Sequence, residues 1–446
     1  MRGSLPLALA AVILSIGAVG LLAFGNITTA MAIAIAISAI LLGVLALSRP
    51  QQRTSVLICI ALTSFAAPSF VFVPSDTIAL SLIFRLAGLA LIALTLSSST
   101  ATVKLSASEL RWVWLFVVPI EIFILCATAP HGKWGDLITY SLGAVVLALT
   151  LISISKLRTS ASVVANAIWL MLIVMAFASL ALGAFLPNIG MEGGRLRGIF
   201  ENSNSMGFFA FLLISATILV RRPSWMSVLA VLAGSVILVL SASRASALAA
   251  AIVVASWLVS RRPLATIVGA LLVGALMLAF VAFDSSLQAL LLRGNDSRSD
   301  GFAVAITEGL SSPLFGIGLS NESLQIASSP LRAFSNAGAV GLIAILLLWI
   351  LLGFSTLRAR PRATWFAVAA IVHSAFEGWL LSPISPLLVV FAALWWAVTR
   401  VLSTEDQTPR REVIATEQSC RGSRVSRYRT NRYLRVDAVT QNDRDS

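Results

Sequence analysis

The stretch VVANAIWLMLIVMAFASLALGAFL, residues 163–186, decides the fold class of this chain. It contains no Asp, Glu, Lys or Arg, and it exceeds the roughly 20 apolar residues that a helix needs to cross the hydrocarbon core of a bilayer. Within lipid every backbone amide needs an internal partner, and a helix supplies one for each residue. The stretch therefore predicts a transmembrane helix.

The same character extends over most of the chain, of which 58% is hydrophobic and only 11% charged. Soluble domains carry about 25% charged residues. The apolar runs are long and uninterrupted, unlike the short alternating segments of a membrane β-barrel. We therefore predict an all-α, polytopic membrane bundle of about 12–14 transmembrane helices. The other candidate spans are 5–24, 29–48, 55–73, 78–97, 110–128, 137–155, 205–220, 226–241, 246–260, 264–283, 336–354, 364–381 and 385–401.

The positions of Lys and Arg in the short connections predict the orientation. One set of alternate connections carries Arg53, Lys104, Lys156, Arg221, Arg222, Arg261, Arg262 and Arg358. Cytoplasmic loops are enriched in these residues, so this set is expected inside, together with both termini. The opposite connections would then face outward, and residues 284–335 would form one large outer loop carrying a short amphipathic helix at 299–310.

The domain organisation follows from composition. Residues 1–402 form the predicted transmembrane domain, and residues 403–446 form a basic cytoplasmic tail rich in arginine. The tail has no well-formed apolar face, so we expect it to be disordered and drawn to the anionic headgroups of membrane lipids. Membrane topology accounts for much of the net charge of +13, which therefore does not imply a nucleic-acid partner. The three cysteines suggest neither a disulfide framework nor a metal cluster.

Four ionisable residues fall inside predicted spans, where charge is costly and usually faces a cavity or a partner. Arg85, Glu121 and Glu377 are expected at similar depth in the outer half of the bilayer, which predicts an outward-facing polar cavity. Alternatively, Arg85 and Glu121 pair and simply tie two helices together. His373 and Glu377 are four residues apart and are expected to share one helix face.

Several arginines are expected on the outer side, although Lys and Arg are usually enriched on the cytoplasmic side. They are Arg195, Arg197, Arg244, Arg293, Arg298 and Arg332. The planar guanidinium matches phosphate oxygens, so a cluster of them suits a phosphate or diphosphate ligand. The alternative is that each one is a snorkelling or salt-bridged loop residue.

Four motifs in the second half of the chain resemble those of one family. The segment RLRGIFENSN, residues 195–204, looks like an R-G-x-F-x-N-x-N pattern, and SASRAS, residues 241–246, is similar to an S-x-S-R pattern. Arg298 followed by SPLFGIG, residues 312–318, resembles an R…P-x-x-G-x-G signature. The segment NAGAVG, residues 336–341, resembles the G-x-x-G that opens the next span. These motifs resemble the O-antigen ligase and polymerase family over about residues 190–400.

The resemblance implies a membrane-embedded glycosyltransferase of bacterial polysaccharide assembly. Such an enzyme moves a glycan from an undecaprenyl diphosphate carrier to an acceptor glycan or lipid. It acts on the outer side of the cytoplasmic (inner) membrane, without a nucleotide sugar, metal or other cofactor. The family often has a His-Asn pair shortly before the G-x-x-G, but IASSPLR at residues 326–332 contains no histidine. The base role of that histidine cannot be transferred to this chain.

Glycosyl transfer from a lipid diphosphate requires stabilisation of the leaving group and a base for the attacking hydroxyl. We assign the diphosphate to Arg197, Arg244 and Arg298. Glu377 is the candidate base, with His373 orienting it or acting in its place.

Further candidates lie near these residues. Arg85 and Glu121 are expected to contact substrate, and Glu121 and Glu201 are weaker candidates for the base. Asn202 and Asn204 could hold sugar hydroxyls or cap the helix that follows.

Two other classes of function remain open. A transporter or flippase of lipid-linked glycans would also use many spans, buried charges and an outward cavity. A non-catalytic scaffold would account for the missing histidine. The large outer loop and the lack of a clear inverted repeat favour an enzyme. Ligase and polymerase activities are not distinguished, because they differ only in the acceptor.

Overall fold

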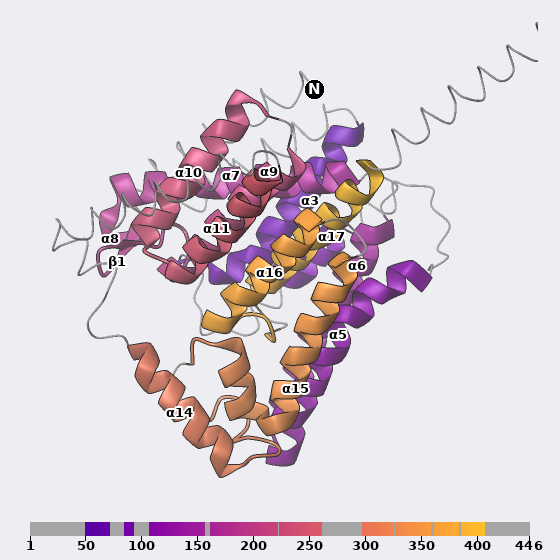
Figure 1. The fold of residues 1–446 in the computed structure, drawn as a ribbon, viewed down its shortest axis with the longest axis vertical. Coiled ribbons are helices and arrows are strands. Elements are labelled where there is room, and N and C mark those ends of the chain that lie inside the picture. The colour runs from indigo at the N-terminus through magenta and orange to yellow at the C-terminus, as the bar shows by residue number, and fades with distance from the viewer. Residues whose placement is uncertain are drawn as a thin grey trace, which may run out of the picture.

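The computed structural model describes residues 50–71, 84–92, 107–156, 161–221, 223–260, 297–324, 326–357, 361–382 and 385–405. Apart from one two-stranded hairpin, the regular structure of these residues is helical (Figure 1). The predicted all-α fold is therefore confirmed. The spans expected at 5–24, 29–48 and 264–283, most of the tail, and Arg293 lie outside the described residues.

Five helices of the described part are long and apolar enough to cross a membrane. They are α5 (Ala107–Thr128), α6 (Trp134–Lys156), α7 (Ala161–Phe185), α9 (Ser203–Val220) and α15 (Ser329–Leu357). Shorter apolar helices are α3 (Pro50–Ala66), α10 (Trp225–Ser241), α11 (Arg244–Val259) and α17 (Pro386–Glu405). The chain is thus a multi-pass membrane protein.

The last helix, α17, lies at the centre of the bundle. It packs against α3, α6, α7, α9 and α16 (Pro361–Phe376), and its residues 388–399 are all buried. Two aromatic contacts fix its position. The ring of Phe116 on α5 meets Trp395 edge-on, with centroids 5.5 Å apart, and Phe366 on α16 lies 5.6 Å from Phe391. A helix that is apolar on every side is expected in such a fully packed position.

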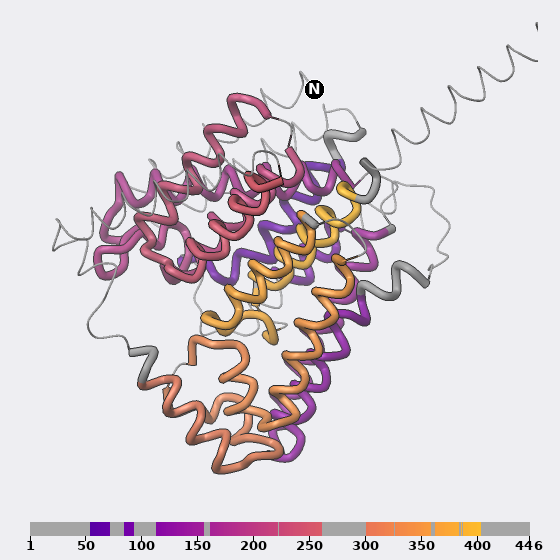
Figure 2. The backbone as a smooth tube through the Cα atoms, viewed as in Figure 1, coloured from indigo at the N-terminus to yellow at the C-terminus, as the bar shows by residue number. Residues whose placement is uncertain are grey.

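Alternate ends of the helices gather on one face of the bundle, which we call the loop face (Figures 1 and 2). The amide of Glu201, before α9, bonds to the carbonyl of Ser69, after α3, at 2.8 Å. The amide of Leu319, before α15, bonds to the carbonyl of Ala127 near the end of α5 at 2.9 Å. Ser246, near the start of α11, reaches α16 near its end. The grouping of connections predicted from Lys and Arg therefore matches the bundle, while the side of the membrane that the face occupies stays a prediction.

Short elements complete the loop face. They are η1 (Ala67–Ser69), η2 (Ala129–His131), α8 (Pro187–Gly190), β1 (Met191–Glu192), β2 (Arg195–Leu196) and α14 (Ser297–Ser311). The strands pair antiparallel, with Met191 opposite Leu196. The helix expected at 299–310 is confirmed as α14.

Predicted boundaries were wrong for three spans. The span expected at 55–73 runs as a helix from Pro50 to Ala66, followed by η1. The span expected at 364–381 ends as a helix at Phe376, and residues 377–381 form a turn. The span expected at 336–354 starts earlier, at Ser329, where Pro330 suits the first turn of a helix because the missing N–H would have no helical partner there.

Candidate functional site

Helix α15 is interrupted close to its start. Ala337 and Gly338 have non-helical backbone angles, and Gly338 has φ of 59° and ψ of −147°, a conformation open essentially to glycine alone. In a continuous helix the amide of Ala339 would bond to the carbonyl of Ser335. It bonds instead to the carbonyl of Pro313 at 2.7 Å. The break thus frees helix carbonyls for other partners.

The loop of residues 312–318 fills that break. The carbonyl of Ser335 accepts from the amide of Ile317 at 2.8 Å, and the carbonyl of Asn336 accepts from the amide of Gly318 at 3.1 Å. Gly316 and Gly318 both have positive φ, of 67° and 87°. A side chain on Gly316 would collide with the backbone of Ser335 and Asn336. The P-x-x-G-x-G and G-x-x-G motifs therefore form one interlocked unit.

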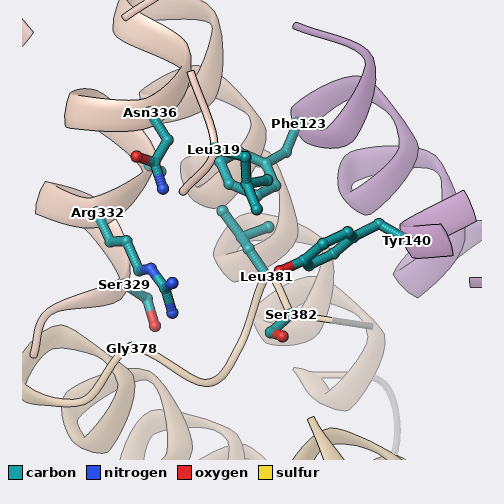
Figure 3. Close-up of a pocket in the computed structure, with 10 residues that line it drawn as sticks. Phe123, Tyr140, Leu319, Ser329, Arg332, Asn336, Gly378, Leu381 and Ser382 are labelled. Atoms are coloured by element: carbon teal, nitrogen blue, oxygen red, sulfur yellow. The ribbon is translucent and has the colours of Figure 1, made fainter. Parts of the chain in front are cut away.

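A pocket opens on the loop face beside this unit (Figure 3). Together with its open mouth and the adjoining solvent it spans about 350 Å³. Arg332 and Ser329 on α15 face Tyr140 on α6 across it (Figure 3). The lining residues are Phe123, Tyr140, Leu319, Ser329, Arg332, Ala333, Asn336, Gly378, Leu381 and Ser382.

A charge-compensated network forms one wall of the pocket. Nε of Arg332 lies 2.8 Å from Oε1 of Glu322, in a salt bridge. The same carboxylate oxygen accepts from Nδ2 of Asn336 at 2.5 Å. Asn336 is completely buried, and its Oδ1 has no hydrogen-bond partner among the residues that the structure describes. A buried acceptor without a partner is costly.

Tyr140 brings an aromatic ring and a hydroxyl to the opposite wall. Its phenol lies within electrostatic range of Arg332, Glu322 and Arg85. Arg85 is buried, with 4% of its surface exposed. Glu121 accepts a hydrogen bond from Ser141, the neighbour of Tyr140, at 3.0 Å. The lining of the pocket includes none of the three residues predicted to form a cavity, Arg85, Glu121 and Glu377.

The turn after α16 closes the pocket from a third side. Ser329 donates its hydroxyl to the carbonyl of Glu377 at 2.7 Å and accepts from the amide of Leu380 at 3.4 Å. Gly378 packs against the carbonyl of Ile326 and the side chain of Arg332. The segment of residues 326–332 therefore lies against this turn.

His373 lies behind that turn and is 1% exposed. Its Nδ1 accepts from the indole N–H of Trp379, and its Nε2 lies 2.9 Å from Oγ of Ser246. An indole can only donate, so Nδ1 carries no proton and a neutral ring donates from Nε2. Ser246 also accepts from the hydroxyl of Ser243 at 2.8 Å. The S-x-S-R segment is thus joined to the pocket through His373 and the turn.

This arrangement corrects the predicted relation between His373 and Glu377. The two were expected to share a helix face, but α16 ends at Phe376 and Glu377 belongs to the turn. Both ring nitrogens of His373 are engaged, by Trp379 and Ser246. His373 is therefore positioned to hold the turn in place.

The R-G-x-F-x-N-x-N segment, residues 195–204, supplies β2 of the hairpin and leads into α9. Arg195 donates from Nε to the carbonyl of Ser241 and from Nη2 to Oδ1 of Asn204, both at 2.7 Å. Asn202 caps α9, accepting from the amide of Ser205 at 2.8 Å. Of the two roles considered for these asparagines, Asn202 takes the capping one, and Asn204 is held by Arg195.

The three arginines assigned to a diphosphate lie on three segments. Arg197 donates from Nε to the carbonyl of Ile189 at 2.7 Å. Arg244 opens α11 and is exposed. Arg298 lies in the first turn of α14, and its side chain is outside the described part. The contact between Arg195 and Ser241 joins the segments of Arg197 and Arg244 on the loop face.

The sequence interpretation missed most of the pocket. Arg332, Ser329 and Asn336 were noted only as loop or motif residues, and Tyr140 was not considered. One signal was present, because Tyr140 is the only tyrosine before residue 428. A tyrosine alone in an apolar span needs a partner for its hydroxyl. Among the residues described, no group of three or more His, Cys, Asp or Glu could hold a metal ion.

Comparison with known proteins identifies no family for this chain. No protein-family model matches the chain, and no curated protein matches it in sequence.

Proposed function

We propose that this protein transfers a glycan from an undecaprenyl diphosphate carrier to an acceptor hydroxyl, with its loop face on the outer side of the bacterial cytoplasmic membrane. The observation that carries the proposal is that the four motifs meet in pairs on that face. The segment 195–204 contacts 241–246 through Arg195, and the loop 312–318 fills the break at 336–338. Residues scattered through some 150 positions would then serve one site.

The leaving diphosphate gains negative charge as the bond to the sugar breaks, and fixed positive groups stabilise that charge. Arg197 and Arg244 supply guanidinium groups on linked segments, and Arg298 supplies a third from α14. Arg244 also occupies the start of α11, where the helix dipole favours an anion. Nearby arginines with fork geometry suit a diphosphate better than lysines would.

The acceptor hydroxyl must lose a proton as it attacks the anomeric carbon. Glu377 is the proposed base, since it sits in the turn that borders the pocket. The hydroxyl oxygen forms the new glycosidic bond, its proton passes to the carboxylate, and the electron pair of the broken bond leaves with the diphosphate. His373 holds the turn through Trp379 and is a positioning residue.

The test is a transfer assay with purified protein in lipid nanodiscs, a polyprenyl diphosphate-linked oligosaccharide and a candidate acceptor. Alanine at Arg244 or Arg298 is expected to reduce transfer by about 100-fold or more, with normal protein abundance. Arg362→Ala, at the start of α16 and away from the loop face, is the matched control. Full activity in both variants would remove the diphosphate assignment, and a wild-type rate for Glu377→Gln would remove the base.

The interruption of helix α15 is the observation that favours a second candidate function, a transporter or flippase of lipid-linked glycans. Transporters often bind their substrates at broken helices, where freed backbone groups face a cavity. Here the carbonyls of Ser335 and Asn336 are already taken by the amides of Ile317 and Gly318, which favours a structural role for the break. Movement of a fluorescent lipid-linked glycan across vesicles without any bond transfer would support the transporter or flippase. If the protein neither transfers the glycan nor moves it across the membrane, a non-catalytic scaffold is favoured.

The acceptor can be identified in cells. If deletion of the gene removes long glycan chains, the protein is a polymerase. If long chains stay on the lipid carrier, it is a ligase.

A further inference from the structure

We infer that the pocket between Arg332 and Tyr140 binds an uncharged sugar ring and not the diphosphate. The inference deepens the proposed function, on which it rests, by assigning the glycan to this pocket and leaving the diphosphate to the other arginines. Sugar binding can be measured without any transfer reaction, so the two proposals can fail separately.

The charge of the pocket argues against a phosphate. The guanidinium of Arg332 is paired with Glu322, whose side chain is only 10% exposed. Asn336 donates to the same carboxylate, which holds Glu322 in place. A phosphate approaching Arg332 would come close to this carboxylate, and like charges in a poorly solvated site repel strongly. A neutral ligand would leave the ion pair intact.

The hydrogen-bonding groups match a polyol. Arg332 supplies N–H donors, and Tyr140 and Ser382 add hydroxyls to the lining, which both donate and accept. The hydroxyl of Ser329 already donates to the carbonyl of Glu377 and accepts from the amide of Leu380, so its oxygen can only accept a further bond. These partners suit the mixed donor and acceptor edge of a sugar.

The opposite wall matches the apolar face of a sugar ring. Tyr140 and Phe123 supply aromatic surface, and Leu319 and Leu381 extend it (Figure 3). A sugar ring presents C–H groups on its faces and hydroxyls around its rim. The pocket has the same division, with rings on the α5 and α6 side and polar groups on the α15 side.

Saturation-transfer NMR on the full-length protein in nanodiscs tests the inference. The probes are the methyl glycosides of glucose, galactose, mannose and N-acetylglucosamine, with inorganic pyrophosphate as the competitor. At least one glycoside is expected to receive saturation, and an excess of pyrophosphate is expected to leave that signal unchanged. Tyr140→Ala should abolish it, whereas Tyr140→Phe, which keeps the ring, should retain it. Thr139→Ala, the adjacent residue outside the pocket lining, should have no effect.

A second variant tests the charge argument directly. Glu322→Gln keeps an oxygen for Asn336 and Arg332 but removes the negative charge, so pyrophosphate is expected to bind this variant and to compete with the glycoside. Phosphorus NMR line broadening reports that binding.

Three outcomes would overturn the inference. Pyrophosphate could displace the glycoside from the unaltered protein, or no glycoside could give a signal that is lost in Tyr140→Ala. The third outcome is that pyrophosphate binds Glu322→Gln no better than the unaltered protein. Circular dichroism and size-exclusion chromatography show whether Tyr140→Ala is folded. Glycoside binding without transfer would refute the proposed function alone.

Discussion

The indole N–H of Trp379 donates to Nδ1 of His373 at 2.9 Å, across the end of α16. This bond fixes the tautomer of the ring, because an indole cannot accept. It also fixes the turn that carries Gly378, Leu381 and Ser382 into the pocket. Through its two ring nitrogens, His373 thereby joins the S-x-S-R segment to the turn that borders the pocket.

Replacing Trp379 with phenylalanine is expected to destabilise the protein. The change removes the hydrogen bond that Nδ1 of the buried His373 accepts from the indole, at a cost of about 1–3 kcal/mol. The midpoint of thermal unfolding, followed by far-UV circular dichroism, should fall by a few degrees. Trp365→Phe, on α16, is the control, since that side chain is 48% exposed. Equal midpoints for the two variants would contradict this role of His373.

The sequence predicted the class of fold and the grouping of the connections, because both depend on properties of single segments. Apolar length marks the spans, and Lys and Arg mark alternate connections. The relation between His373 and Glu377 could not be predicted in this way. It depends on the residue at which α16 ends and on the contact that Trp379 makes with His373. The spacing of residues along a helix predicts neither of these.

Gly338→Ala is expected to disrupt the interlocked unit. A β-carbon there would lie 2.5 Å from the carbonyl carbon of Leu314, and the backbone angles of Gly338 cost other residues about 1–3 kcal/mol. We expect a lower unfolding midpoint and faster proteolysis of the loop 312–335. Gly353→Ala in the same helix is the matched control, because a β-carbon there meets nothing within 4 Å. That change should be neutral or stabilising by about 0.5–1 kcal/mol. If the two variants behaved alike, the break would have no structural role.

The loop that carries the pocket is expected to loosen in acid. Burial raises the pKa of the Glu308 carboxyl, but hydrogen bonds from the hydroxyl and amide of Ser323 and from the hydroxyl of Ser335 outweigh it and hold the pKa below the ordinary value of 4.5. A carboxyl with a lowered pKa in the folded state contributes stability that is present above its unfolded pKa. That contribution is lost as the pH falls through the folded value.

Hydrogen exchange of residues 312–335 between pH 6 and pH 3, corrected for the intrinsic rate, measures this effect. Protection should fall below about pH 4.5 in the unaltered protein. Glu308→Gln should already show reduced protection at pH 6 and little further change, because it cannot titrate. A pH dependence that survives in Glu308→Gln would assign the effect to another group.

The pocket itself shows what the sequence could not supply. Its polar wall joins Glu322, from the loop before α15, to Arg332 and Asn336 on adjacent turns of that helix. Its aromatic wall comes from α5 and α6, nearly two hundred positions earlier. Contacts over that separation follow from how the helices pack, which apolar periodicity does not specify. The glycines of the loop 312–318 allow close backbone approach to the other glycine motif, a contact that their sequence spacing did not predict.

The link between Arg195 and Asn204 allows a test of whether Asn204 binds substrate or only supports the hairpin. Arg195 holds Ser241 and Asn204 with two different nitrogens of one planar group, which a lysine cannot reproduce. If Asn204 acts only through Arg195, the unfolding midpoints of Arg195→Lys, Asn204→Ala and the double variant should be non-additive, with a coupling of about 0.5–3 kcal/mol. The transfer rate should then follow stability across the three. If Asn204 also holds the glycan, Asn204→Ala should lower transfer well beyond its effect on the midpoint, and Arg195→Lys should not. We expect the first result, because Oδ1 of Asn204 is already committed to the guanidinium at 2.7 Å.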